Sequence, residues 1–357
     1  MSSPRIRSVS AVVCNFNGAA YLEECLRALQ TQDGLDEILV VDNASTDGSL
    51  ELLREHFPEL EVLRLEANGG PCVARNRGML AARNDWILAV DNDAVLAPDC
   101  LAKLRRALED RPDCVIAQPR SVRDDDPTVV HYDGGAFHYV GLLALRNFYT
   151  PVTQATGDGV TDTDALIGIA PLLDRRAVLA VDGYDEDFFY LAEDYDLALR
   201  LRQTGQRLCS VSDAIVRHKG GTAGLSFRGG GYPARRAYLM SRNRWLLLAK
   251  NHAGWTLFVS LPGLFVYESA WLIFATLQGH LVPHLRGKWH VLGALRRTLK
   301  KRRRVQARRI VGDRELLVGG PLTLSPSLLE RPPARALARL LDGTLAAWWF
   351  VARTLVR

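Results

Sequence analysis

The chain has 357 residues, of which 48% are apolar and 24% are charged, and this ordinary balance excludes a disordered or collagen-like chain. Its length exceeds that of a typical single core, so we expect one large domain with an appendage. The net charge of +5 is unevenly distributed: residues 221–357 hold 23 Lys+Arg and 5 Asp+Glu, whereas residues 1–220 hold 22 and 35, which predicts different roles for the two parts.

Apolar strands alternate with helical patterns in the first hundred residues. The apolar runs are residues 10–14, 37–42, 60–65 and 86–91, and helical spacing separates them. Nearly continuous apolar strands joined by helices predict a parallel sheet covered on both faces. Ligands bind such sheets at the carboxyl ends of the strands. Since Cys14, Asp42 and Asp91 lie at these ends, we expect them to converge on one cleft.

The most informative short pattern is Asp91-Asn92-Asp93, at the end of an apolar strand. Strand side chains alternate between faces, so both carboxylates can aim at one point. A hard divalent cation prefers such oxygen ligands, usually shared with substrate phosphates. Alone the pattern is weak, because Asp-x-Asp also occurs at turns.

The remainder of the chain is less regular. Residues 119–163 are rich in Asp, Gly and Thr and predict loops with an added hairpin, and residues 211–216 predict one or two strands. Residues 255–281 are apolar and long enough to cross a bilayer, although Pro262, Gly263, Glu268 and Gln278 make a poor span. The sequence leaves open whether this segment spans the membrane or lies on it.

Basic residues follow that apolar segment, with a dense run at 300–304, and a second apolar patch covers 345–351. Apolar segments beside basic clusters are typical of the cytoplasmic surface of a membrane. RNA binding and a solvated basic helix without a partner are the alternatives. Six cysteines without a C-x-x-C pair indicate a reducing cytoplasm, and residues 1–10 carry no secretory signal pattern.

Five local patterns occur in one order along the chain. They are residues 41–48, residues 68–70 with 74–78, residues 91–93, residues 183–197 with Arg200, and His218 before residues 220–222. As an ordered set they resemble the family 2 glycosyltransferases with the GT-A fold, particularly rhamnosyltransferase-like members, over residues 8–250. The segment 235–251 is similar to the one that follows the catalytic domain in that group.

The resemblance implies an α/β fold with a Rossmann-like mixed sheet covered by helices. We expect a catalytic domain at 1–250 and a helical, apolar and basic membrane-associating region at 251–357. The implied reaction moves a sugar, with inversion, from a UDP- or dTDP-linked donor such as rhamnose to a saccharide or polyprenol-linked acceptor in cell-surface polysaccharide synthesis. We expect Mn²⁺ or Mg²⁺ as cofactor, no nucleic acid partner, and a peripheral or shallowly inserted position at the inner face of the cell membrane.

A divalent ion would offset the negative charge that builds on the departing diphosphate. The ligands would be Asp93, less directly Asp91, and His218 as neutral imidazole. Basic residues are otherwise sparse around the predicted strand ends. The alternative interpretation of His218 is a surface histidine beside a glycine turn.

The acceptor hydroxyl needs a base, and a carboxylate within hydrogen-bond reach serves this role. Asp194 matches the family's base, with Glu193 and Tyr190 on the acceptor side. Like-charge repulsion from Glu193 is expected to raise the pKa of Asp194. The alternative is that both acids merely favour the start of a helix.

Further residues are expected around the donor nucleotide. A carboxylate at Asp42 can accept a hydrogen bond from the N3–H of uracil or thymine, although capping the next helix is the alternative role. The remaining donor-side residues implied are Asn15, Asn17, Asn68, Gly69, Asn76, Asp91 and Asn92. The loops 119–163 and 222–232 are expected to set donor and acceptor choice.

Other classes fit the sequence less well. A Rossmann dehydrogenase needs G-x-G-x-x-G after its first strand, and residues 15–18 read Asn-Phe-Asn-Gly. A sugar nucleotidyltransferase needs a Gly-rich, basic loop at the same place. The remaining alternative is a non-catalytic protein that binds membrane or RNA through its basic region.

Overall fold

The computed structural model describes residues 6–220 and 232–356. These fall into two compact units: residues up to 134 with 146–201 and 206–220, and residues 135–145 and 202–205 with the C-terminal part. The second unit therefore begins before the predicted boundary at residue 250 and includes a hairpin from the middle of the chain. Gly221, Thr222 and most of the predicted loop 222–232 lie outside the described residues.

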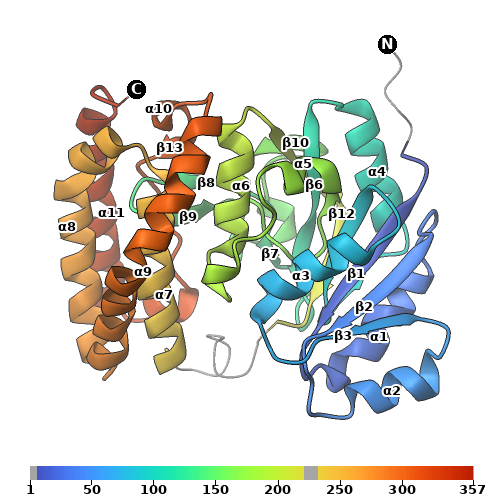
Figure 1. The fold of residues 1–357 in the computed structure, drawn as a ribbon. Helices are drawn as coiled ribbons and strands as arrows, with labels where there is room; N and C mark the ends of the chain where they lie inside the picture. Colours follow the sequence, from blue (N-terminus) through green and yellow to red (C-terminus); the bar gives the residue numbers. More distant parts are fainter. Residues whose placement is uncertain (1–5, 221–231, 357) are drawn as a thin grey trace. The chain divides into compact units, whose positions relative to one another are not determined.

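The first unit is built on a mixed sheet of ten strands (Figure 1). The path runs β10-β12-β6-β11-β4-β1-β2-β3, with β5 paired to β12 and β7 paired to β6. The strands are β1 (Val9–Asn15), β2 (Glu37–Asp42), β3 (Glu61–Arg64), β4 (Trp86–Asp91), β5 (Ala94–Leu96), β6 (Cys114–Arg123), β7 (Val130–Tyr132), β10 (Val160–Thr163), β11 (Leu172–Asp174) and β12 (Arg207–His218). The predicted mixed α/β architecture is confirmed.

Strand pairing sets the position of the strand ends. Strands β4, β1, β2 and β3 are parallel, with Asn15 opposite Asp42 and Cys14 opposite Asp91. The predicted edge, where Cys14, Asp42 and Asp91 lie at the carboxyl ends of adjacent strands, is therefore confirmed. Residues 211–216 belong to the single long strand β12, which carries an irregularity between Val211 and Ile215.

Helices cover both faces of this sheet. Helix α1 (Ala19–Gln30) buries Leu22, Leu26 and Leu29 at helical spacing, and it shares an apolar cluster with α2 (Ser49–His56), α4 (Cys100–Asp110) and the strand residues Val13 and Val40. Helix α3 (Gly70–Ala81) lies on the opposite face, since Gly78 packs on the alternate strand residues Val12 and Val41. The helices α5 (Arg175–Ala180) and α6 (Glu193–Gln203) complete the first unit's helical elements.

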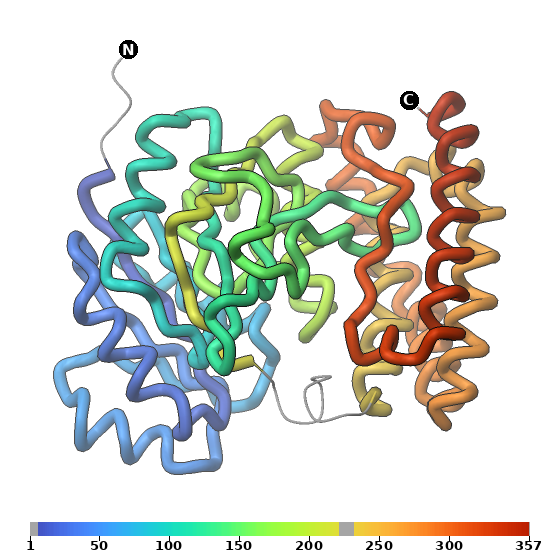
Figure 2. Tube along the Cα trace, turned by 180° about the vertical axis from the view of Figure 1, so that it is seen from behind, coloured from blue at the N-terminus to red at the C-terminus, as the bar shows by residue number. Residues whose placement is uncertain are grey.

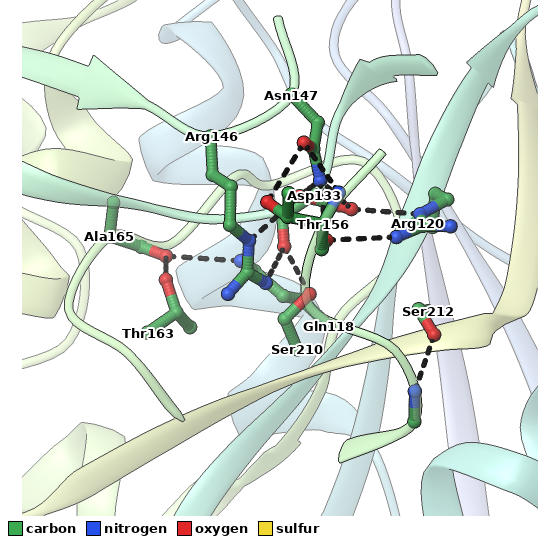
Figure 3. A network of polar contacts seen from close by, with 11 residues as sticks. Gln118, Arg120, Asp133, Arg146, Asn147, Thr156, Thr163, Ala165, Ser210 and Ser212 are labelled. Atoms are coloured by element: carbon green, nitrogen blue, oxygen red, sulfur yellow. Dashed lines mark hydrogen bonds and ion pairs between the residues drawn. The ribbon is translucent and has the colours of Figure 1, made fainter. Parts of the chain in front are cut away.

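A buried carboxylate network orders the segment predicted as loops (Figure 3). Asp133 is fully buried and accepts hydrogen bonds from Arg120 at 2.8 Å, Arg146 at 3.1 Å and Asn147 at 2.9 Å. Its backbone carbonyl accepts a bond from Ser210 on β12. These contacts hold Asp133 and the segment 146–156 against strands β6 and β12, so this part of the segment is more ordered than its composition indicated.

We expect Asp133→Leu to lower the free energy of unfolding by about 3–5 kcal/mol, because the change leaves the buried Arg120 guanidinium without its carboxylate. Urea unfolding followed by tryptophan fluorescence measures the loss. Asp158→Leu, at an exposed position of the same region, is the matched control. Equal stability of the two variants would contradict the role given to Asp133.

The second unit consists mainly of helices, which appear in Figure 2 as coils of the tube coloured from yellow to red. They are α7 (Ala234–Asn251), α8 (Gly254–Leu277), α9 (Leu281–Arg308), α10 (Asp313–Leu316) and α11 (Pro332–Ala352). The predicted hairpin is formed by β8 (Gly135–His138) and β9 (Leu142–Leu145), and β13 (Leu317–Val318) adds to it. Among the described residues, α8 alone combines the length and apolar composition that a membrane crossing requires.

Candidate active site

Asp93 and His218 form a close pair at the end of β4. Strand β4 ends at Asp91, and the short strand β5 that follows pairs with the end of β12, which brings His218 opposite Ala94. His218 Nε2 lies 3.3 Å from Asp93 Oδ2. Burial opposes ionisation of Asp93, but the hydrogen bond and charge of His218, together with backbone hydrogen bonds, hold the pKa of Asp93 below its usual value.

His131, on β7, supports the other side of the His218 ring. The two Nδ1 atoms lie 3.0 Å apart and the rings stack with centroids 5.1 Å apart. One of the two nitrogens must donate and the other accept, so this contact restricts the tautomer and orientation of His218. Its Nε2 atom is thereby directed to Asp93.

Arg75, on α3, links the first aspartate to the predicted base. Its buried guanidinium contacts Asp91 at 2.8 Å and Asp194 at 3.1 Å, and it donates to the carbonyl of Gly168 at 3.0 Å. Glu193 lies 3.6 Å from the same group. A cation therefore does stand at the strand ends, contrary to the expectation of sparse basic residues there, and these carboxylates already engage it.

Glu193 and Asp194 begin helix α6 behind a tightly bent loop. The φ values of Phe189, Leu191 and Ala192 are 64°, 71° and 69°. Residues other than glycine adopt this backbone conformation at a cost of about 1–3 kcal/mol each. Asp194 Oδ2 accepts the backbone N–H of Gly168 at 3.0 Å, where a larger residue than glycine would collide with the carboxylate. These contacts orient the Asp194 side chain.

The two acids of this pair differ in their surroundings. Burial, with the charge of Asp194, raises the pKa of Glu193 to about 8. Burial also raises the pKa of Asp194, against the opposing charge of Arg75. The direction expected for the pKa of Asp194 is found, but its cause is burial and not the predicted repulsion by Glu193. At neutral pH Glu193 is therefore mainly protonated, and unequal surroundings of this kind are how paired carboxyl groups acquire different roles.

Tyr132 marks the place where the aspartates converge. Its pKa is raised first by burial and then by the charges of Asp91, Asp194 and Asp93. All three carboxylates therefore lie within electrostatic reach of one phenol, and Tyr190 contributes to the same environment. The structure brings together the catalytic and metal-binding residues that the sequence predicted.

The donor-side residues form a polar network at the neighbouring strand ends. Asp42 is 1% exposed, and its two oxygens accept hydrogen bonds from the side chain of Asn15 at 3.0 Å and the backbone of Ser45 at 3.0 Å. Asn15 in turn accepts from Asn92 at 2.8 Å. Asn17 accepts the backbone N–H of Thr46 at 2.7 Å. The loop after β2 is thus held against β1 and the Asp-x-Asp turn.

Asn68 and Gly69 lie at the start of helix α3, and Asn76 lies in the middle of this helix. Asn68 accepts the backbone N–H of Gly70 at 2.9 Å, and Gly69 donates to Asn43 at 3.0 Å. Gly70 has φ +80° and its backbone approaches Phe189 too closely for a side chain. Asn76 bonds both backbone groups of Tyr184, so its amide joins α3 to the turn before Glu193.

The residues present fit a divalent cation that is completed by a ligand. Across the described ranges, no three His, Cys, Asp or Glu side chains come together as a preformed metal cage. The predicted set is incomplete because Arg75 engages Asp91, which leaves the pair Asp93 and His218. The carboxyl groups of Asp91, Asp93 and Asp194 nevertheless outnumber the single positive charge of Arg75 by two. A divalent cation would balance that difference.

Sequence reasoning missed Arg75, His131, Tyr132 and Gly168. Arg75 stands in the motif 74–78, among small residues on a helix that covers the sheet, and this isolated charge was the available signal. No signal of comparable strength marked His131 or Tyr132, which lie in the segment predicted as loops.

Comparison with known proteins agrees with this arrangement. Residues 10–164 match the profile of the glycosyl transferase family 2. The chain is 25% identical over 269 residues to the N-acetylglucosaminyl-diphospho-decaprenol L-rhamnosyltransferase of Mycobacterium tuberculosis (strain CDC 1551 / Oshkosh), a match that covers 68% of this chain and 85% of the relative. It is 35% identical over 77 residues to the glycosyltransferase AglE of Haloferax volcanii, covering 20% of this chain and 25% of that protein.

Among solved structures, the crystal structure of GalNAc-T7 with UDP, GalNAc and Mn²⁺ superposes with a TM-score of 0.56 at 18% identity, covering 73% of this chain. The match spans 51% of that chain, about half its length, and shows a shared fold. The fold is that of the GT-A class, and the sequence matches support a nucleotide-sugar glycosyltransferase. These matches support a glycosyltransferase: residues 10–164 are similar to family 2, and the sequence is similar to rhamnosyltransferases. The nucleotidyltransferase and non-catalytic alternatives are set aside.

Proposed function

We propose that this enzyme transfers a sugar, with inversion, from a UDP- or dTDP-linked donor such as dTDP-rhamnose to a saccharide carried on a polyprenyl diphosphate. The observation that carries the proposal is the guanidinium of Arg75 between Asp91 and Asp194, beside the pair Asp93 and His218. This arrangement would set the carboxylate of Asp194 next to the site proposed for the diphosphate. The decaprenyl-linked acceptor in the name of the mycobacterial relative supports the acceptor class.

Asp194 is the base in this proposal. Its carboxylate takes the proton of the attacking acceptor hydroxyl, while Arg75 and the Gly168 N–H hold it in place. A single base with direct displacement inverts the anomeric centre. Glu193, protonated at neutral pH, and Tyr190 lie beside it on the acceptor side.

Asp93 and His218 would hold Mn²⁺ or Mg²⁺, with Asp91 in support. When bound, such an ion supplies Lewis-acid stabilisation of the diphosphate leaving group. Asp42, with Asn15 and Asn92 behind it, would face the base of the donor through its remaining acceptor capacity, since a carboxylate offers about four lone-pair sites. Asn17, Asn68, Gly69 and Asn76 shape this pocket through the loops that they hold.

The location proposed is the cytoplasmic face of the membrane, where a polyprenyl-linked acceptor is anchored. The reaction would contribute to cell-surface polysaccharide synthesis. This membrane location is inferred from the acceptor class and from the basic C-terminal region, and not from the proposed catalytic residues.

Calorimetry with UDP-, dTDP- and GDP-sugars, with Mn²⁺ and with EDTA, tests donor choice and metal dependence together. We expect the preferred donor to bind in the presence of Mn²⁺ and to lose roughly 10- to 100-fold in affinity with EDTA. A loss of affinity of this size is typical when the contacts that support a metal site are removed. Equal binding in EDTA would remove the metal from the proposal.

We expect Asp93→Asn to weaken Mn²⁺-dependent donor binding by roughly 10- to 100-fold and to leave the weak binding in EDTA unchanged, because a charged ligand is lost without a change in shape. Asp99→Asn, an exposed carboxylate shortly after it in the chain, is the matched control. A loss of the same size with and without Mn²⁺ would contradict a metal-ligand role.

A further inference from the structure

Helix α8 is apolar on its outward side as well as on its buried side. The side that it buries in the bundle combines Thr256, Ser260 and Gly263 with Val259, Leu264, Tyr267 and Ala275. The exposed side carries large apolar side chains, with Phe258 60% and Phe265 73% exposed. They are Trp255, Phe258, Leu261, Phe265, Ile273 and Leu277. A helix of a water-soluble bundle faces its apolar side inward, so the outward side of α8 is built for an apolar surrounding.

Helix α9 carries a second exposed stripe. Its members follow one another at intervals of three and four residues, which places them on one face. They are Val282, Leu285, Trp289, Leu292, Leu295 and Leu299. Exposed cations lie beside and beyond this stripe, namely Arg286, Arg296, Arg297, Lys300, Arg303 and Arg304.

The two stripes adjoin. Lys288 on α9 bonds Glu268 on α8 at 2.6 Å, and this pair marks the side on which the helices meet. Phe265 stands three residues before Glu268, and Leu285 three residues before Lys288, so one member of each stripe neighbours that pair. The exposed residues of α8 and α9 therefore form one surface, here called the apolar-basic surface.

Helix α11 extends the surface on the other side of α8. The indole N–H of Trp255 donates to the carbonyl of Leu355 at 2.9 Å, and that of Trp348 donates to Val259 at 3.1 Å, so the two helices run antiparallel side by side. Between them lies an open crevice of about 310 Å³. Its lining is Pro262, Gly263, Val266, Thr344, Ala347 and Trp348. A hydrocarbon chain suits such a lining.

The charges within the bundle argue against a transmembrane position of α8. Glu268, past the middle of the helix, contacts Arg244 and Lys288 and accepts the indole N–H of Trp245 at 2.5 Å. If α8 crossed the bilayer, these partners on α7 and α9 would enter the hydrocarbon with it, at a large cost in free energy. Contact along one face keeps them outside.

We propose that the apolar-basic surface docks on an anionic phospholipid bilayer, with the outward side of α8 seated among the acyl chains and the cations of α9 at the headgroups. Apolar burial and attraction to anionic lipid act together in interfacial helices, and neither suffices alone. This surface would hold the enzyme at the membrane, where the proposed function places it. The inference therefore rests on the proposed function.

Flotation of the full chain with vesicles tests the proposal. We expect binding to vesicles that contain phosphatidylglycerol, weak binding to phosphatidylcholine alone, and release by high salt or alkaline carbonate. Phe258→Ser with Phe265→Ser should weaken binding by roughly tenfold for each side chain. Lys300→Glu with Arg303→Glu should weaken it by about fivefold or more for each position.

Leu80→Ser and Arg106→Glu, exposed positions of the first unit, are the matched controls and should bind vesicles like the unchanged chain. Thermal unfolding and Mn²⁺-dependent nucleotide binding confirm that each variant is folded. Normal binding by the paired variants, retention in carbonate, or binding of RNA in place of vesicles would overturn the proposal. Transfer to a water-soluble acceptor tests the proposed function separately, since it needs no bilayer.

Discussion

Asp194→Asn should lower the rate of sugar transfer by about 10³-fold, because the contribution of a positioned base is typically 10²–10⁴-fold. Asparagine keeps the shape of the side chain and its bond to the Gly168 N–H, but it cannot accept the acceptor's proton. Donor binding in the presence of Mn²⁺ should stay within about threefold of the unchanged enzyme, well below the 1.4 kcal/mol of a tenfold change. Single-turnover kinetics and calorimetry measure the two quantities.

Glu193→Gln is the matched comparison. Because burial keeps Glu193 mainly protonated at neutral pH, the amide resembles the acid that it replaces, and we expect transfer to fall by less than about tenfold. If Glu193→Gln abolished transfer and Asp194→Asn did not, the roles of the two acids would have to be exchanged.

The pH profile gives a second test of the same residue. Asp194 acts as a base only when ionised, and burial raises its pKa above the ordinary value. The rate of transfer should therefore decline with falling pH at a higher pH than an exposed aspartate would cause, and this acid limb should vanish in Asp194→Asn. An unchanged limb in the variant would assign it to another group.

The strand ends could be predicted from the sequence because the rules that place them are local. An apolar run that ends in Asp42 or Asp91 predicts a buried strand, and parallel pairing brings such ends to one edge. The structure pairs Asn15 with Asp42 at this edge. The order of the motifs along the chain then indicated the proposed base, Asp194, and the histidine at the end of β12.

The remaining parts of the site depend on contacts that no local pattern encodes. Arg75 meets Asp194 across 119 positions of sequence, and its direction depends on how α3 is rotated on the sheet. His131 reaches His218 because β7 pairs with β6, within a segment whose polar composition indicated loops. The buried acid Asp133 orders that segment through distant partners, and burial of a single aspartate cannot be read from composition.

Arg75→Met should both destabilise the protein and stop transfer. The change removes a buried guanidinium and leaves Asp91 and Asp194 without their shared cation, and breaking a buried ion pair in this way typically costs about 3–5 kcal/mol. We expect a decrease of that size in the free energy of unfolding in urea. Transfer should fall by at least 10²-fold, since the base also loses its orientation.

Arg75→Lys separates the two effects, and Arg77→Met, exposed on the same helix, is the matched control. A lysine retains the charge but offers one compact ammonium, so it cannot bridge two carboxylates and the Gly168 carbonyl in the manner of a planar guanidinium. We expect Arg75→Lys to recover part of the stability and little of the transfer rate, with donor binding retained. Recovery of both would mean that Arg75 contributes only charge, and recovery of neither would mean that the fold at this edge depends on the guanidinium itself.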